Sequence, residues 1–348
     1  MPELFVTNFN RNFTGVSATA ANVIRRQVRD FDLALVGQPL PGCPDPITLR
    51  EARTLSRAAP PNRPFAIWHV RRNPEMRAGL WARDVLRLPI RLVFTSAAQR
   101  RHSAFPRWLI GRMDAVIATT EEAASFVPHV RAVVPHGADT DLFTPAQDRA
   151  AAWAALGLGG TAGIATIGRV RPEKGTDLFV DAMIRALPDL PGVTALVVGR
   201  AAREHQKFDL DLKDRVQRAG LIDRIRFVGE LPATDLPALM RALSLVVQLP
   251  RYEGYGMVPL EAMASGTPFI GSRAGYFEAF SAQGRSGVIV PQEAAQAAAE
   301  ATRAILSDPD RHAAMAIAAR EIAERSFSAR AEAAGIAHVY DLLWSDRG

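Results

Sequence analysis

Short apolar runs alternate with helical or loop segments along most of the chain, and this alternation limits the fold more than any other feature. Buried parallel strands are nearly continuous apolar runs, and crossover helices separate them. The N-terminal part has such runs at 4–9, 31–37, 65–70, 90–96, 114–120 and 131–137. The C-terminal part has them at 163–170, 194–200, 224–231, 243–250 and 267–273. The pattern predicts an α/β protein with two Rossmann-like parallel-sheet domains.

A change of composition marks the expected domain boundary. The segment DLFTPAQ at 141–147 is followed by a short alanine-rich helix and then by GLGGTAG at 157–163. Such a shift from proline to glycine is typical of an inter-domain connection. We therefore expect an N-terminal domain at 1–150 and a C-terminal domain at 151–326.

Several function classes are excluded by missing motifs. The sequence contains no P-loop, no GxGxxG after the first strand, no HExxH and no GxSxG. Cys43 is the single cysteine, which excludes an internal disulfide and favours a reducing compartment. The N-terminus lacks a signal-peptide pattern, and no apolar run is long enough to cross a bilayer. We expect a cytoplasmic protein.

Positive charge is concentrated in one stretch. The net charge is +6, and residues 71–112 contain ten arginines against only Glu75 and Asp84. Such a stretch indicates an anionic partner, namely a phospholipid surface, an acidic glycolipid or nucleic acid. The alternative is general solvation by arginine, because the chain has 42 Lys and Arg residues of which only three are Lys.

Two cations follow the first strand of the C-terminal part. Arg169 and Lys174 lie where the strand at 163–170 gives way to a helix, and Gly175 follows them. Ligands of α/β sheets are held beyond the carboxyl ends of strands. The pair is suited to bind a diphosphate, whereas the alternative is a solvated loop with unrelated charges.

A glycine-rich turn between two carboxylates is the second motif. Glu253 and Glu261 flank the turn that opens a helix. The backbone amides of the turn can point at an anion, and they belong to Gly254, Tyr255, Gly256, Met257 and Val258. One carboxylate could bind a sugar hydroxyl and the other a ribose. Alternatively, Glu261 is a first-turn carboxylate stabilised by the helix dipole.

Together these motifs resemble retaining glycosyltransferase family 4, which has the GT-B fold. The resemblance rests on IGRVRPEKG at 167–175, EGYGMVPLE at 253–261 and PHGADTDLFTP at 135–145, in the order and spacing of the family. It implies two Rossmann-like domains facing each other across a cleft, with a nucleotide-sugar donor between them.

The N-terminal part is similar to a narrower group, the lipopolysaccharide inner-core mannosyltransferases of alphaproteobacteria. The similar segments are NFNRNFTGVSAT, IWHVRRNPEM, LVFTSAAQRRHS and RWLIGRMDAVIATT. Such enzymes transfer mannose from GDP-mannose to the core sugar 3-deoxy-D-manno-octulosonic acid (Kdo). The similarity implies GDP-mannose as donor and an anionic, lipid-linked acceptor.

The family resemblance assigns donor-binding roles by position. Gly15 matches a glycine near the donor phosphates, although Thr14 stands where the family commonly has a second glycine. Arg169 and Lys174 match the cations that bind the diphosphate. Glu253 matches the carboxylate on the donor sugar.

Three further matches complete the set. Glu261 matches the carboxylate on the ribose, and His69 matches a histidine near the transferred sugar, with a core histidine as the alternative. The final helix, 327–348 around Tyr340, resembles the family's return to the first domain. The N-terminal domain is therefore expected to be discontinuous.

Cleavage of a sugar-diphosphate bond puts negative charge on the leaving phosphate. Two cations and a helix N-terminus can stabilise that charge, and no Asp-x-Asp is placed to hold a metal. We therefore expect no metal and no other cofactor. The family implies retention, with the departing phosphate taking the acceptor proton or with a protein nucleophile. Expected catalytic residues are His69, Arg169, Lys174 and Glu253.

The stretch from Arg71 to Arg112 is expected to serve the acceptor. Arg71, Arg72, Arg100 and Arg101 are the candidates for binding an anionic glycolipid. A few basic residues also suffice for reversible contact with an anionic membrane. We expect peripheral association with the cytoplasmic face of the inner membrane.

Three alternatives stay open from the sequence. The donor could be UDP-glucose or UDP-N-acetylglucosamine, because the named residues bind phosphate and ribose rather than base. A non-catalytic sugar-nucleotide-binding protein could keep the same fold, although the full residue set argues against it. Nucleic-acid binding is not expected, since the arginine stretch lacks a recognised motif and a series of stacking aromatics.

Overall fold

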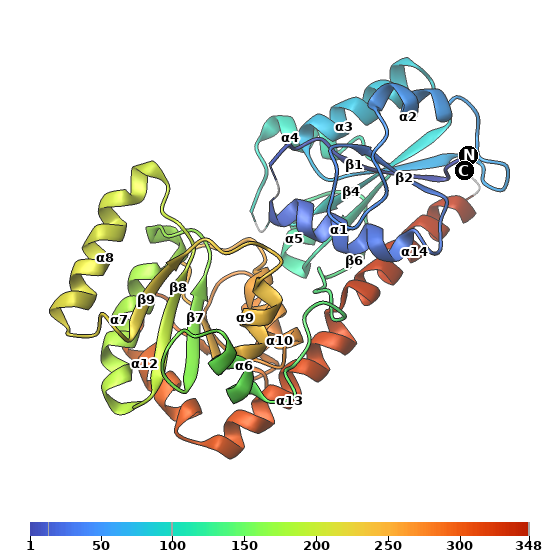
Figure 1. Cartoon of the computed structure of the whole chain (residues 1–348). Coiled ribbons are helices and arrows are strands. Elements are labelled where there is room, and N and C mark those ends of the chain that lie inside the picture. The colour runs from blue at the N-terminus through green and yellow to red at the C-terminus, as the bar shows by residue number, and fades with distance from the viewer. Residues whose placement is uncertain (13, 99, 347–348) are drawn as a thin grey trace. The chain divides into compact units, whose positions relative to one another are not determined.

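The protein consists of two compact α/β units, each built on a six-stranded parallel sheet (Figure 1). The computed structural model describes residues 1–12, 14–98 and 100–346. Unit 1 contains Met1–Gly137 and the chain from Phe327 onward, and unit 2 contains Ala138–Ser326. The predicted fold class, α/β with two Rossmann-like parallel-sheet domains, is confirmed.

In unit 1 the sheet has the order β2-β1-β3-β4-β5-β6, and every neighbouring pair is parallel. Its strands are β1 (Leu4–Asn8), β2 (Leu33–Gly37), β3 (Ala66–Val70), β4 (Ile90–Ser96), β5 (Ala115–Ala118) and β6 (Val130–Val133). Its helices are α1 (Gly15–Gln27), α2 (Leu49–Leu55), α3 (Asn73–Leu80), the π-helical turn η1 (Trp81–Val85), α4 (Ala104–Ile110), α5 (Glu121–Ser125) and α14 (Ala329–Ser345).

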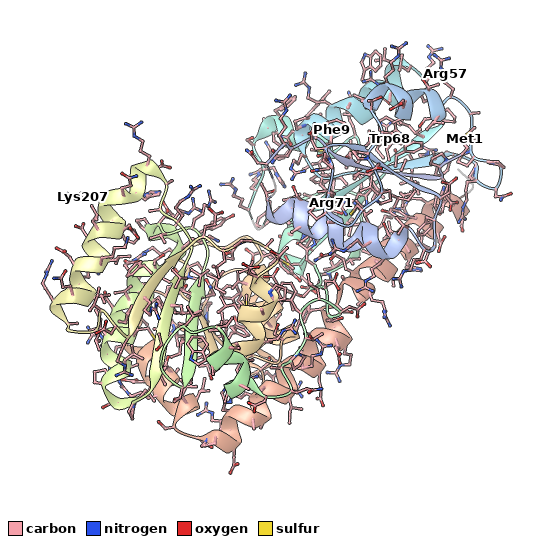
Figure 2. All side chains as sticks on the ribbon, viewed as in Figure 1. Met1, Phe9, Arg57, Trp68, Arg71 and Lys207 are labelled. Atoms are coloured by element: carbon pink, nitrogen blue, oxygen red, sulfur yellow. The ribbon has the colours of Figure 1, made fainter. Side chains whose placement is uncertain are left out.

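Alternate residues of these strands supply two apolar layers, one on each face of the sheet. On one face Val6, Ile67 and Val93 pack with α1 and α14. On the other face Phe5 and Trp68 pack with α3 and α4, and Trp68 lies inside unit 1 (Figure 2). Both faces are covered, as the continuous apolar runs predict.

Unit 2 has the sheet order β12-β11-β10-β7-β8-β9, again entirely parallel. Its strands are β7 (Ala162–Ile167), β8 (Val193–Val198), β9 (Ile225–Gly229), β10 (Leu245–Gln248), β11 (Phe269–Ser272) and β12 (Gly287–Val290). Its longer helices are α6 (Arg149–Ala155), α7 (Thr176–Ala186), α8 (Gln206–Arg218), α9 (Leu236–Ala242), α10 (Met257–Ala264), α11 (Phe277–Ser281), α12 (Ala295–Leu306) and α13 (Pro309–Ser326). Short 3-10 turns are η2 (Pro172–Lys174), η3 (Leu187–Asp189) and η4 (Arg203–His205).

The chain passes into unit 2 after Gly137, earlier than the boundary placed at residue 150. The intervening segment is bonded to unit 2, since Arg320 donates to the carbonyl of Phe143 at 2.7 Å. After Ser326 the chain returns to unit 1, where α14 packs against α1. Of the final helix expected at 327–348, residues 347–348 lie outside the described residues.

The order of the strands reverses beside β1 in unit 1 and beside β7 in unit 2. β1 lies between β2 and β3, and β7 lies between β8 and β10. Open parallel sheets bind ligands beyond the carboxyl ends of their strands at such reversals. The fold therefore points to the loops after β1 and β3 and to the loops after β7 and β10.

Candidate active site

An ion pair joins the two loops at the strand-order reversal of unit 2. Lys174 ends the turn η2 after β7, and Glu253 follows β10. The Nζ atom of Lys174 lies 2.6 Å from Oε2 of Glu253, and the two side chains are 25% and 20% exposed. The other oxygen of Glu253 accepts a hydrogen bond from the Gly254 N–H at 2.9 Å. Two residues predicted to bind the same donor are thus in direct contact.

Two glycines allow these loops to approach each other. Gly175 has φ +67°, and a Cβ there would lie 1.8 Å from the carbonyl oxygen of Leu249. Gly256 has φ +103°, and a Cβ there would lie 2.0 Å from the ring of Phe277. Only glycine fits either position. The first brings Lys174 to the end of β10, and the second lets α10 begin close to Glu253.

Arg251 fastens the same loops together, and the sequence analysis did not single it out. Its guanidinium donates to both carboxylate oxygens of Asp177, at 2.9 and 2.8 Å, and lies 2.6 Å from Glu293. Its backbone N–H donates to the carbonyl of Glu173 at 3.0 Å. The hydrogen bonds to Asp177 are the main cause that raises the pKa of Arg251. Its partners are distant in sequence, so no local pattern signals this role.

The start of α10 presents backbone donors near Glu253. The amides of a helix's first turn have no acceptor within the helix, and Gly256 offers no side chain to cap them. Tyr255 is buried and stacks on Tyr276 with ring centroids 5.5 Å apart, which holds the turn. Binding of an anion by the amides of residues 254–258 stays a prediction.

Glu261 lies beyond the first turn of α10, which contains no acidic residue. The alternative of a first-turn carboxylate is therefore wrong. Part of its side chain reaches solvent, yet its carboxyl is strongly desolvated, and this burial raises its pKa from 4.5 to about 7. Its proposed hydrogen bonds to ribose hydroxyls stay a prediction.

Arg169 lines a cavity of about 370 Å³ beyond the ends of β7, β8 and β9. Its side chain is exposed. Gly168 and Gly199 form part of the wall, and the close approach of their backbones excludes a side chain at Gly199. The cavity lies next to the strand-order reversal at β7, and it is large enough for part of a nucleoside.

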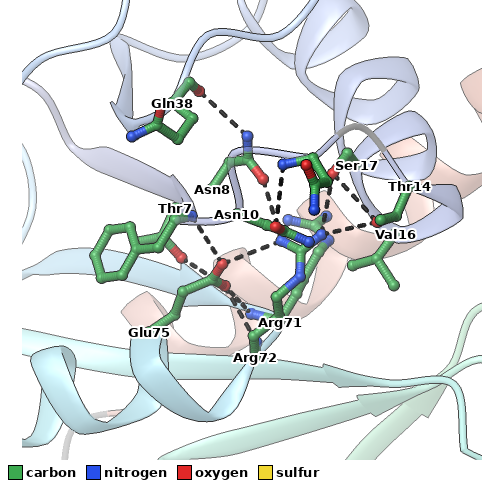
Figure 3. Close-up of polar contacts among 12 residues, drawn as sticks. Thr7, Asn8, Asn10, Thr14, Val16, Ser17, Gln38, Arg71, Arg72 and Glu75 are labelled. Atoms are coloured by element: carbon green, nitrogen blue, oxygen red, sulfur yellow. Dashed lines mark hydrogen bonds and ion pairs between the residues drawn. The ribbon is translucent and has the colours of Figure 1, made fainter.

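Glu75 organises the corresponding loops of unit 1 (Figure 3). It is fully buried and accepts hydrogen bonds from the Thr7 hydroxyl, from the backbone N–H groups of Phe9, Arg71 and Arg72, and from the Arg72 guanidinium. The Arg72 guanidinium also donates to Asn8, Thr14 and Ser17. The loop after β1 is therefore tied to the start of α3.

Gly15 is the first residue of α1, at the end of this tied loop. A Cβ added at Gly15 would meet no atom within 4 Å. The space beside Gly15 is therefore open, and the role of Gly15 near the donor phosphates stays a prediction. Phe13, in the segment NFNRNFTG, lies outside the described residues.

His69 lies in the core of unit 1 with no exposed surface. Its Nδ1 lies 2.5 Å from the Tyr340 hydroxyl and its Nε2 lies 2.7 Å from the Thr95 hydroxyl. Burial, followed by the charge of Arg71, holds its pKa well below 6.5. Both ring nitrogens are hydrogen-bonded within the protein, as expected if His69 is a core histidine. Direct contact with a transferred sugar would require these bonds to change.

The four arginines proposed for the acceptor differ in their surroundings. Arg100 and Arg101 are exposed, whereas Arg72 is engaged in the network around Glu75. Arg71 is 8% exposed and lines a cavity of about 210 Å³ in unit 1. Strand alternation puts it on the same face as His69.

Neither a metal-binding cluster nor a membrane-spanning helix is present in the described ranges. Within residues 1–12, 14–98 and 100–346, no group of three or more His, Cys, Asp or Glu residues is arranged to hold a metal ion. In that same part of the chain, no helix has the length and apolar character needed to span a membrane.

Comparisons with known proteins relate the whole chain to one family. Residues 157–322 match the family described as glycosyl transferases group 1. The chain is 40% identical to the lipopolysaccharide core biosynthesis mannosyltransferase LpsB of Rhizobium meliloti, over 98% of this chain and 97% of LpsB. It is 41% identical to the enzyme of the same description, LpcC, of Rhizobium leguminosarum, over 99% and 97%. Anabaena Alr3699/HepE, solved with UDP and glucose, has the same fold, with a TM-score of 0.81 at 19% identity over 98% of this chain and 100% of HepE.

Proposed function

Because the chain belongs to the group 1 glycosyltransferase family, we propose that it transfers mannose from GDP-mannose to Kdo of the lipopolysaccharide inner core. The similarity to two lipopolysaccharide core mannosyltransferases over nearly the full length supports the sugar and the pathway. The observation that carries the proposed site of the nucleotide-sugar donor is the Lys174–Glu253 pair before α10. It sets a cation and a carboxylate side by side where the fold holds ligands.

In the proposed mechanism the donor lies at the strand-order reversal of unit 2. Lys174, Arg169 and the first amides of α10 stabilise the charge that develops on the leaving diphosphate. Glu253 orients the donor sugar, and Glu261 accepts the ribose hydroxyls. The anomeric configuration is retained.

The departing phosphate takes the proton of the acceptor hydroxyl in this proposal. Glu253 is a poor nucleophile because one oxygen is paired with Lys174 and the other accepts an N–H. His69 is neutral and bonded on both sides, so it positions the end of β3. A double displacement would need a different carboxylate.

We propose that no metal or other cofactor takes part. Lys174 and Arg169 supply the positive charge that a divalent ion would otherwise bring to the diphosphate. Transfer measured with excess EDTA tests this directly. An unchanged rate is expected, and a loss of activity that Mg²⁺ or Mn²⁺ restores would overturn it.

The acceptor is proposed to be lipid-linked, with the enzyme peripheral on the cytoplasmic face of the inner membrane. On α4, Phe105 and Trp108 are 52% and 53% exposed and stack with ring centroids 6.3 Å apart. Arg112 lies over the Trp108 ring at 4.6 Å. Exposed aromatics beside arginines suit an anionic lipid surface. Co-sedimentation with phosphatidylglycerol vesicles should be lost in Phe105→Ser/Trp108→Ser, and equal binding by both proteins contradicts it.

Thermal unfolding in the presence of different donors tests the proposed function. A selective ligand raises the unfolding temperature by mass action. Stabilisation is expected with GDP-mannose and not with UDP-glucose, UDP-N-acetylglucosamine or ADP-heptose. A response to a UDP-sugar alone would overturn the mannose donor and keep the family. No response to any nucleotide sugar would favour a non-catalytic protein.

A further inference from the structure

The Arg71 side chain is buried without partners for two of its donors. It is 8% exposed, and its Nε and Nη1 atoms lie inside the protein with no hydrogen-bond acceptor. Buried polar groups in folded proteins are nearly always hydrogen-bonded, and a buried charge needs a partner. Burial lowers the pKa of this guanidinium, and the charges of Glu332 and Glu75 offset only part of that effect.

Glu75 and Glu332 are the two carboxylates whose charges act on Arg71, and both are already bonded to other groups. Glu75 accepts from Thr7, from Arg72 and from three backbone N–H groups. Glu332 is 2% exposed, contacts His136 at 2.7 Å and accepts from the Gly137 N–H at 2.8 Å. Neither makes an ion pair with the Arg71 guanidinium within the described residues. No described residue supplies an acceptor for the Arg71 Nε and Nη1 atoms, so a bound ligand can supply it.

Arg71 opens onto the cavity of about 210 Å³ in unit 1. Its walls include Thr95, Ser96, His102 and His136, which supply polar groups around the guanidinium. Burial, followed by the charge of Arg100, lowers the pKa of His102, so this histidine is neutral near pH 7. His136 is paired with Glu332. Among the described lining residues, Arg71 therefore supplies the one positive charge that lacks an ion-pair partner.

We propose that Arg71 binds the carboxylate of a sugar-acid acceptor in this cavity. The inference rests on the proposed function and adds the group by which the acceptor is recognised. A carboxylate carries a single negative charge and matches one guanidinium, and its two oxygens fit the planar donor fork. A phosphate dianion would leave one charge uncompensated in a cavity with one cation. Serine and threonine hydroxyls in the wall can bind the adjoining sugar hydroxyls.

Acceptor analogues test the contact. A soluble Kdo glycoside and its methyl ester differ only in the carboxylate, so kcat/KM for mannose transfer is measured on both. The wild type should prefer the acid by about 100-fold, since loss of a charge-assisted bond leaves a buried cation unpaired. In Arg71→Gln the preference should vanish through a higher KM for the acid. Arg77→Gln removes a charge from the exposed surface of α3 and should keep the preference.

Binding measurements separate this inference from the proposed function. Calorimetric titration with the Kdo glycoside, in the absence of any donor, should show saturable binding that weakens at least about tenfold in Arg71→Gln. This result does not depend on which donor the enzyme uses. GDP-mannose should bind wild type and Arg71→Gln equally. If Arg71→Gln loses GDP-mannose but still discriminates acid from ester, Arg71 serves the donor phosphate and the inference fails. Displacement of the glycoside by inorganic phosphate at equal concentration would also overturn it.

The unfolding temperature of the unliganded protein gives a readout independent of any ligand. An uncompensated buried cation destabilises the fold, as binding residues often do. Arg71→Met should therefore unfold at a higher temperature than the wild type, whereas Arg77→Met should not change it. A lower unfolding temperature in Arg71→Met would show that the guanidinium is a structural group, which contradicts the inference.

Discussion

The two units differ in how the cations of their candidate sites are paired. In unit 2, Lys174 meets Glu253 at 2.6 Å, and Arg251 is bonded to Asp177 and Glu293. In unit 1, Arg71 keeps two buried donors without an acceptor. Under the proposed function, the loops that bind the donor are held in shape by their own ion pairs, whereas the cavity proposed for the acceptor leaves Arg71 without a negative partner, which a substrate can bring. Pre-organised charges suit the end where the leaving group develops charge, and an unpaired cation suits recognition.

The largest expected effect comes from Lys174→Ala. Removing this cation takes away stabilisation of the leaving diphosphate and leaves Glu253 without its partner, so kcat should fall by about 10² to 10³. Steady-state transfer with saturating GDP-mannose measures it. The matched control is Lys207→Ala on the exposed surface of α8 (Figure 2), which should leave kcat unchanged. Equal rates in the two variants would break the comparison on the donor side.

Gly254 and Gly256 lie in the same loop, and comparing them tests whether this loop can adopt only one shape. Gly256→Ala forces a Cβ into the ring of Phe277 at φ +103° and should cost about 3 kcal/mol of unfolding free energy. Gly254→Ala has open space around it and no positive φ, so it should change stability by less than about 0.5 kcal/mol. Urea titrations compare them. Similar losses in both variants would contradict the packing argument.

Glu261 makes the stability of the protein depend on pH. Burial raises its pKa from 4.5 to about 7, so the folded protein binds this proton more tightly than the unfolded chain. Its stabilising contribution is complete below pH 4.5 and is lost as the pH rises through 7, a change of roughly 3 kcal/mol. Urea titrations between about pH 5 and pH 8 should show this slope.

Glu261→Gln supplies the control for that slope and a second readout. The variant should lose the Glu261 part of the pH dependence of stability, and an identical slope in both proteins would contradict the assignment. If Glu261 also binds ribose as the carboxylate, GDP-mannose should bind more tightly above pH 7 than below it in the wild type. In Glu261→Gln this inflection should be absent.

The smallest expected effect is at His69. His69→Gln keeps one polar contact to Tyr340 or Thr95 and loses the other, which should cost about 1 kcal/mol of stability. Donor binding should not change. A loss of kcat much larger than the loss of stability would show that His69 reaches the substrate after all.

The sequence predicted the parallel strands and singled out the loops after β7 and β10 because both features are local. Continuous apolar runs identify buried strands without any knowledge of their partners. β12 (Gly287–Val290) was missed because only three apolar residues, at 288–290, follow the polar and glycine-containing segment 281–287. The position of Glu261 within α10 was misjudged in one alternative, since helix starts depend on the φ of Gly256 and not on residue type alone.

The contacts that the sequence could not predict join distant segments. Arg251 meets Asp177, 74 residues away. His69 is closed off by Tyr340, 271 residues away, because the chain returns to unit 1 at its end. Four similar arginines of the basic stretch could not be ranked from the sequence. Their burial and partners single out Arg71.

The most direct test of the division between the two units is to measure GDP-mannose binding by Lys174→Ala and Arg71→Gln side by side in calorimetric titrations. The account predicts that Lys174→Ala loses most of its affinity for GDP-mannose and that Arg71→Gln binds it as the wild type does. If instead Arg71→Gln loses the donor and Lys174→Ala keeps it, the donor and acceptor sides are assigned the wrong way round.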